Sequence, residues 1–77
     1  MINTKEILRK YKNIALVGAS KDLNKTSTIV MKYLQNYGYK VYPVNPNIKG
    51  EEILGETVFG KLSEIDGPVD IIDVFRP

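Results

Sequence analysis

The sequence predicts a doubly wound α/β domain whose strands form a parallel sheet. Three largely apolar runs, at residues 14–17, 40–44 and 69–75, have the length and composition of buried strands. Apolar residues at helical spacing lie between the first two runs, and glycine or proline marks the segment boundaries. Strand, helix, strand, connection and strand is the order that gives right-handed crossovers in a parallel sheet.

The elements of the first half follow from periodicity and capping residues. Asn3 or Thr4 can cap a first helix. The first strand after it is closed by Gly18 and is expected to be buried on both faces. Residues 19–27 are polar and rich in cap-forming side chains, so they are expected to form a loop that leads into a second helix, which Gly38 ends. The predicted buried face of that helix consists of Ile29, Val30, Tyr33, Leu34 and Tyr37.

The elements of the second half have weaker patterns. Pro43 within the second strand indicates an edge strand or a missing ladder bond. Residues 51–57 have no sustained period and are expected to form a loop, with a short extended piece near 58–59. Residues 61–65 are expected to form at most a short helix. The third strand, at 69–75, is apolar at nearly every position apart from two aspartates.

Length and composition restrict the domain count and the location. The 77 residues allow one domain, spanning 1–77, with a marginal core. The absence of Cys and His excludes a disulfide framework and a Cys/His zinc site. A chain without Cys also fits a reducing compartment, so a cytoplasmic location is expected. No apolar run resembles a signal peptide or a membrane span, so no contact with a membrane is expected.

Charge is distributed unevenly along the chain, although the net charge is only +2. Residues 1–49 carry nine Lys or Arg against two acidic residues, a net +7, and residues 50–77 carry two against seven, a net −5. The basic half is where an anion is expected to bind, unless its lysines form only a solvated surface. A nucleic-acid module is disfavoured, because no helix presents arginines for reading bases and the net charge is low.

Gly18-Ala19-Ser20 follows the first strand, where ligands bind in open α/β sheets beside helix N-termini. Gly18 permits a tight turn, Ala19 keeps side-chain bulk away from a pyrophosphate, and Ser20 offers a hydroxyl. Residues 25–28 add one positive charge and three hydroxyls where the helix begins. An ordinary tight turn with an N-cap is the alternative explanation.

Three sharper motifs do not fit this segment. The dinucleotide fingerprint fails because Ser20 and Leu23 replace two glycines and the second strand ends without a carboxylate for ribose hydroxyls. The Walker A loop fails because Asn24 replaces its glycine. The G-x-S-x-G motif fails because Asp22 replaces the last glycine and the chain has no His. A nucleotide with an additional ribose phosphate, coenzyme A or NADP, fits the missing carboxylate and the lysines better than NAD.

Four segments of the chain resemble the bacterial CoA-binding domain family, whose members are small Rossmann-like proteins similar to the CoA-binding domain of the succinyl-CoA synthetase alpha subunit. The segments are residues 17–20, 38–46, 50–55 and 70–77. The resemblance implies a Rossmann-like fold that binds coenzyme A. It also implies a family domain that continues well past residue 77, so the chain is expected to be an N-terminal portion, truncated after the third long strand. A second copy or a partner chain is then expected to complete the sheet.

The resemblance also implies a role for individual residues. It implies that Gly18, Ala19 and Ser20 form the pyrophosphate loop and that Lys25 and Ser27 lie beside the phosphates. It places Val44, Asn45 and Pro46 along the adenosine, and Phe75 and Arg76 at the closing side of the crevice. Family members often have Arg-Pro-Ser where this chain has Lys25-Thr26-Ser27, which implies weaker phosphate binding, because Lys lacks the bidentate fork of Arg.

The sequence favours a non-catalytic module that binds coenzyme A or an acyl-CoA through its ADP moiety. An NADP-dependent reductase, or an acyl-CoA ligase subunit with catalytic residues elsewhere, is the alternative. The absence of His, Cys and a paired acid and base near Gly18 argues against chemistry within these residues. Asp73 is expected to be a buried carboxylate bonded to backbone amides, and Glu51, Glu52 and Glu56 to be exposed loop charge rather than a metal site.

Overall fold

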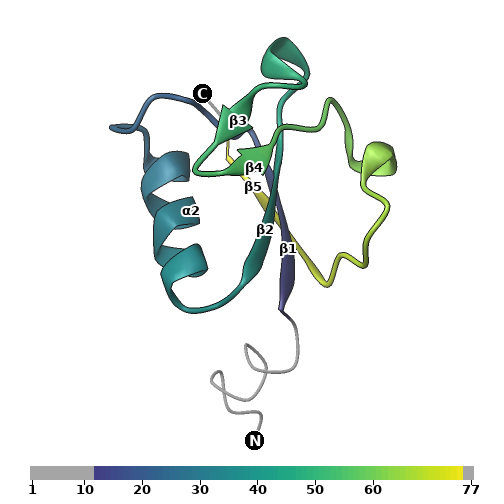
Figure 1. Cartoon of the computed structure of the whole chain (residues 1–77), viewed down its shortest axis with the longest axis horizontal. Coiled ribbons are helices and arrows are strands. Elements are labelled where there is room, and N and C mark those ends of the chain that lie inside the picture. Colours follow the sequence, from purple (N-terminus) through teal and green to yellow (C-terminus); the bar gives the residue numbers. More distant parts are fainter. Residues whose placement is uncertain (1–11, 76–77) are drawn as a thin grey trace, which may run out of the picture.

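The computed structural model describes residues 12–75, and the helix predicted to begin at Asn3 or Thr4 lies outside the described residues. Its centre is a parallel sheet with the strand order β2-β1-β5. The strands are β1 (Asn13–Val17), β2 (Lys40–Val44) and β5 (Ile71–Val74). The predicted fold class and the parallel arrangement are therefore confirmed. Because the strands are parallel, their carboxyl ends lie at the same end of the molecule, the upper end in Figure 1.

The central strand β1 is buried on both faces, as its apolar run predicts. Ile14, Ala15 and Leu16 are at most 3% exposed, because β2 and β5 flank the strand and other elements cover it. Pro43 lies in β2, at one edge of the three-stranded sheet, which agrees with the prediction for this strand.

Helix α2 (Thr26–Asn36) connects β1 to β2 and lies on one side of the sheet (Figure 1). Its existence agrees with the prediction, but only part of the predicted apolar face packs inward: Val30 and Leu34 contact the core. The buried side chains are Ser27, Thr28 and Met31. Three residues of the predicted face are more than half exposed: Ile29, Tyr33 and Tyr37. In the first turn, the buried Thr28 hydroxyl donates a hydrogen bond to the carbonyl oxygen of Ser20.

Gly38 ends α2 as predicted. Its φ of 88° lies in the left-handed region, where a side chain is strained. The N–H of Gly38 donates to the carbonyl of Gln35, and the N–H of Tyr39 reaches back to the carbonyl of Leu34 at 3.1 Å. This pair of bonds is a Schellman motif, and it satisfies helix carbonyls while the chain turns into β2.

Residues 51–57 form a hairpin rather than the predicted loop. Strands β3 (Glu52–Ile53) and β4 (Glu56–Thr57) pair antiparallel across a turn in which Leu54 and Gly55 have φ values of 49° and 85°. Positive φ at both central residues is typical of a tight two-residue hairpin turn. Two-residue strands are too short to show an alternation of apolar and polar residues, so Gly55 is the only sequence feature that indicates the turn. The buried side chain of Ile53 joins the core cluster that includes Leu16 and Met31.

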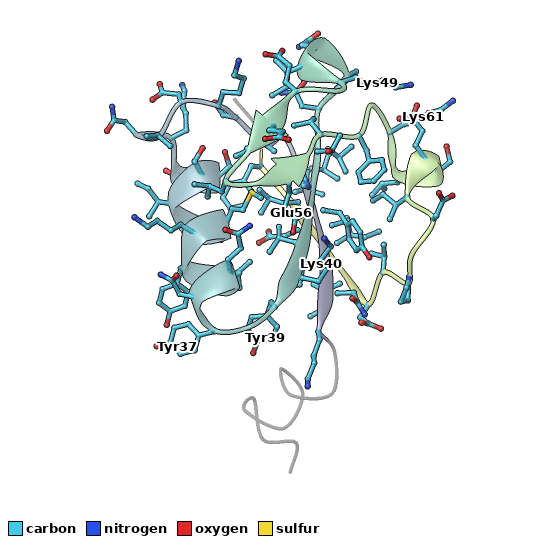
Figure 2. All side chains as sticks on the ribbon, in the orientation of Figure 1. Tyr37, Tyr39, Lys40, Lys49, Glu56 and Lys61 are labelled. Atoms are coloured by element: carbon cyan, nitrogen blue, oxygen red, sulfur yellow. The ribbon has the colours of Figure 1, made fainter. Side chains whose placement is uncertain are left out.

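Three ion pairs join the basic half of the chain to the acidic half. Within residues 12–75, every lysine in a salt bridge precedes residue 50 and every glutamate follows it. The pairs are Lys21–Glu51, Lys40–Glu56 and Lys49–Glu64. Figure 2 shows Lys40 and Glu56 directed toward one another between β2 and β4. Part of the charge asymmetry along the sequence therefore serves pairing within the fold.

The connection from β4 to β5 runs on the side of the sheet opposite α2 (Figure 1) and contains a short 3₁₀ helix at Leu62–Glu64, as predicted. Glu64 accepts hydrogen bonds from Lys49 and from the N–H of Gly60, and these two contacts lower its pKa from the ordinary value. On β5, Ile72 and Val74 are 54% and 59% exposed. Among the described residues, no helix has the length and apolar character needed to cross a membrane.

Candidate functional site

A cavity of about 590 Å³ lies where the carboxyl ends of the three strands meet the amino end of α2. Its walls come from four segments that are distant in sequence but adjacent in space: the end of β1 and its loop, the start of α2, the end of β2, and the residue after β5. The lining residues are Val17, Gly18, Ala19, Ser20, Lys25, Thr26, Ser27, Val44, Asn45, Pro46, Asn47 and Phe75.

The structure brings nine of the ten sequence-predicted site residues to this cavity. The tenth, Arg76, lies outside the described residues. Sequence reasoning assigned no site role to the lining residues Val17 and Asn47, and it gave Thr26 only as one of the hydroxyls where the helix begins. Each of the three lies next in sequence to a predicted residue. The sequence therefore located the site through the ends of the strands and the start of the helix, and not through the type of each residue.

Gly18 is required by the fold at this point. Its φ is +88°, and a Cβ atom there would collide with the carbonyl oxygen of Phe75. The close approach follows from the pairing of β1 with β5, in which the N–H of Phe75 donates to the carbonyl of Val17 at 2.8 Å. Only glycine combines this φ with so short a distance between backbones.

The loop after β1 divides its backbone donors between the fold and the cavity. The N–H groups of Gly18 and Ala19 both donate to the carbonyl oxygen of Val44, at 2.9 and 3.3 Å. The N–H groups of Ser20 and Lys21 make no hydrogen bond to any atom of residues 12–75. The Ser20 side-chain oxygen accepts from the N–H of Asp22 at 3.1 Å, so its own hydroxyl hydrogen can be donated elsewhere. Any backbone donors that this loop offers a ligand therefore begin at Ser20.

The amino end of α2 supplies further unpaired donors. Lys25 is the N-cap residue, its side chain forms no capping hydrogen bond, and the first turn contains no acidic residue. The N–H of Thr28 donates to the carbonyl of Lys25, whereas those of Thr26 and Ser27 have no partner among residues 12–75 and lie beside the cavity. They add to the positive end of the helix dipole and to the Lys25 charge. No acidic side chain of residues 12–75 lines the cavity, so the site favours an anion.

Asn45 connects the end of β2 to the loop after β1. Its Nδ2 atom donates to the carbonyl oxygen of Ala19 at 2.8 Å, and its Oδ1 atom accepts from the N–H of Asn47 at 2.9 Å. The side chain is thus already bonded at both its amide atoms. These two hydrogen bonds link segments of the fold beside the cavity. They leave the Asn45 amide fewer hydrogen bonds to make with a ligand.

The other acidic candidates have structural explanations. Asp73 is half-buried, and its carboxylate forms no hydrogen bond within residues 12–75, so the predicted bonds to backbone amides are wrong. Glu51 and Glu56 form ion pairs with Lys21 and Lys40. Glu51 is exposed, as predicted for loop charge, but Glu56 lies in β4 and is half-buried.

Comparison with known proteins shows which family this sequence matches. The family model described as a CoA binding domain matches residues 12–77. An uncharacterized protein, YneT, from Bacillus subtilis strain 168 is 50% identical over 72 residues, which cover 94% of this chain and 52% of the relative. Subunit alpha of the ADP-forming acetate–CoA ligase II from Pyrococcus furiosus is 40% identical over 67 residues, covering 86% of this chain and 14% of that subunit.

A solved structure agrees with the same assignment. The structure of cell-free ID.343 from Thermus thermophilus superposes with a TM-score of 0.88 at 44% sequence identity, and the match covers 99% of this chain and 59% of that chain. The chain therefore spans only about half the length of the Bacillus subtilis relative and somewhat more of this structural neighbour.

Proposed function

Because this chain belongs to the CoA-binding domain family, we propose that its cavity binds coenzyme A or an acyl-CoA through the ADP moiety. One observation carries the proposal. The residues that the family resemblance implies for coenzyme A, apart from Arg76, surround a single cavity at the amino end of an uncapped helix. The match of the family model over residues 12–77 supports the same ligand.

The chemistry of the cavity suits a pyrophosphate. The unpaired N–H groups of Ser20, Thr26 and Ser27 and the charge of Lys25 all favour negative charge. A volume of about 590 Å³ is in the usual range for a site that holds a nucleotide-sized ligand. The apolar side chains of Val44, Pro46 and Phe75 offer surface for the adenosine.

The end of β2 favours coenzyme A over NAD. A dinucleotide site usually has a carboxylate there, which accepts hydrogen bonds from the ribose hydroxyls. In this chain the position is occupied by Val44-Asn45-Pro46, and no acidic group lines the cavity within the described residues. A ribose that carries a phosphate is not repelled by such a site, and Lys25 can attract it.

We also propose that this chain binds its ligand without transforming it. The sequence has no His and no Cys, and the cavity lining contains no acid to pair with Lys25. A second candidate is a part of an acyl-CoA ligase, favoured by the 40% identity to the Pyrococcus furiosus ligase subunit. ADP formation from ATP in the presence of acetate and coenzyme A, measured with the purified chain, would favour the ligase. Binding without turnover fits both candidates, because the catalytic residues of such a ligase would lie outside this chain.

Thermal unfolding with a panel of ligands tests the proposal. Coenzyme A, acetyl-CoA, NADP, NAD and ATP are titrated separately against the chain. A ligand that binds only the folded state stabilises it by about 2.7 kcal/mol when its concentration is about 100 times Kd. We expect coenzyme A and acetyl-CoA to raise Tm at lower concentrations than the other three. Stabilisation by NADP without stabilisation by coenzyme A would show that the proposal is wrong.

A further inference from the structure

Two side chains from other elements hold the loop after β1. From the end of β2, Asn45 Nδ2 donates to the carbonyl oxygen of Ala19 at 2.8 Å. From the first turn of α2, Thr28 Oγ1 donates to the carbonyl oxygen of Ser20, also at 2.8 Å. Both contacts are partly buried, and Thr28 is only 3% exposed. The two consecutive peptide groups on either side of Ser20 are therefore each fixed at the carbonyl end.

Fixing a carbonyl also fixes an N–H group. In a planar trans peptide the C=O and the N–H point in opposite directions. The carbonyl of Ala19 shares its peptide group with the N–H of Ser20, and the carbonyl of Ser20 shares its group with the N–H of Lys21. In this loop the N–H groups of Ser20, Lys21 and Leu23 bond to no atom of residues 12–75, and of these three residues only Ser20 lines the cavity. The N–H groups of Gly18 and Ala19 are committed to Val44.

We propose that Asn45 and Thr28 are positioning residues of the anion site. They fix the two peptide groups around Ser20 and so orient the Ser20 N–H, which lies at the cavity, for a ligand phosphate. The identity of the anion rests on the proposed function, but the orientation of the loop is a property of the ligand-free protein. Thr28 thereby gains a role that its buried place in α2 does not by itself suggest. Asn45 acts through the loop and not as a ligand for the adenosine.

A pair of substitutions at Thr28 tests the first contact. Thr28→Val keeps the branched shape and removes the donor, whereas Thr28→Ser keeps the donor. We expect Thr28→Val to raise the Kd for coenzyme A, measured by calorimetry, about fivefold to tenfold, and Thr28→Ser to stay within about twofold of the wild type. A role confined to stability would lower Tm and leave Kd unchanged. That result, or equal effects of the two variants, would overturn the role of Thr28.

Asn45→Asp tests the second contact. The carboxylate still accepts from the N–H of Asn47 but cannot donate to Ala19. Because the change also adds negative charge, Asn47→Asp is the matched control. Asn47 lines the same cavity, and its side chain forms no hydrogen bond within residues 12–75. We expect Asn45→Asp to raise Kd at least about fivefold more than the control does. Equal losses would attribute the effect to charge alone and overturn the role of Asn45.

A measurement without ligand separates this inference from the proposed function. In amide NMR spectra of the ligand-free chain, Thr28→Val and Asn45→Asp should shift or broaden the Ser20 and Lys21 resonances, and Thr28→Ser should not. If the wild type fails to bind coenzyme A, the proposed function is wrong, and these spectra still decide whether the loop is held as described. Unchanged Ser20 and Lys21 resonances in both disruptive variants would overturn the inference.

Discussion

Two features of the structure require glycine at position 18, where the chain leaves β1 beside the cavity. Its left-handed φ lets the chain leave β1, and its missing Cβ allows the backbone of Phe75 to pass close by. The sequence predicted a tight turn here from the glycine alone. The contact with Phe75 could not be predicted, because it depends on which strand pairs with β1 on that side.

Gly18→Ala should be more disruptive than the same change at another left-handed glycine. Gly38 has the same φ of +88°, but its Cβ would have no heavy atom of the described residues within 4 Å. Gly38→Ala should therefore lower stability by the conformational term of about 1 kcal/mol, whereas Gly18→Ala adds a collision with backbone. Each kcal/mol corresponds to about 4–8 °C in Tm for a domain of this size. Equal losses of Tm would show that β5 does not approach Gly18 as described.

Lys25→Glu tests the charge at the cavity, and Lys32→Glu on α2 is its matched control. Lys32 is exposed and does not line the cavity. Reversal at Lys25 should weaken coenzyme A binding about tenfold. Comparison with dephospho-CoA then locates the contact. A larger loss for coenzyme A indicates the 3′-phosphate, and equal losses indicate the pyrophosphate. If Lys25→Glu and the control leave both affinities unchanged, Lys25 is a surface lysine.

Helix α2 shows what periodicity can and cannot predict at the scale of an element. Gly38 and the apolar content predicted the helix and its end. Of the predicted apolar face, Val30 and Leu34 pack against the core, whereas Ile29, Tyr33 and Tyr37 are exposed. Thr28, which no apolar pattern marks, is buried and bonds to the loop. That contact exists only once the loop is folded, so no pattern within the helix contains it.

Thr26→Asp should raise stability and lower affinity at the same time. Thr26 is in the first turn of α2, which has no acidic residue, and it lines the cavity. A carboxylate there stabilises the helix by about 0.3–1 kcal/mol through the dipole and the unpaired N–H groups. The same charge occupies the place proposed for a phosphate. Thr26→Asn serves as the neutral control. A variant with higher Tm and unchanged Kd for coenzyme A would place the anion elsewhere.

At the scale of the whole molecule, the chain spans about half of its Bacillus subtilis relative, and its sheet has an open edge within the described residues. Parallel strands are normally covered on both faces. On β5, Ile72 and Val74 are instead more than half exposed. The sequence predicted the strand correctly, but exposure depends on what packs against it, and that information lies outside the strand.

We therefore expect the 77-residue chain to self-associate through β5. Ile72→Lys should reduce the association, because it adds charge to the exposed apolar face. Ile29→Lys is the control, since Ile29 is similarly exposed, at 57% against 54%, but lies on α2. Sedimentation velocity over a range of concentrations measures the association. A wild-type chain that stays monomeric at high concentration, or equal effects of the two variants, would contradict this expectation.

The most direct test of the central claim is an NMR titration of the chain with coenzyme A, read at assigned backbone amides. The account predicts that shifts concentrate at Ser20, Lys21, Thr26 and Ser27 and at the end of β2, and that they saturate. Amides at the far end of the sheet, such as those of Asn13 and Lys40, should stay unchanged, because they lie at the amino ends of their strands. Saturable shifts centred away from the cavity, or no shifts at millimolar coenzyme A, would contradict the account.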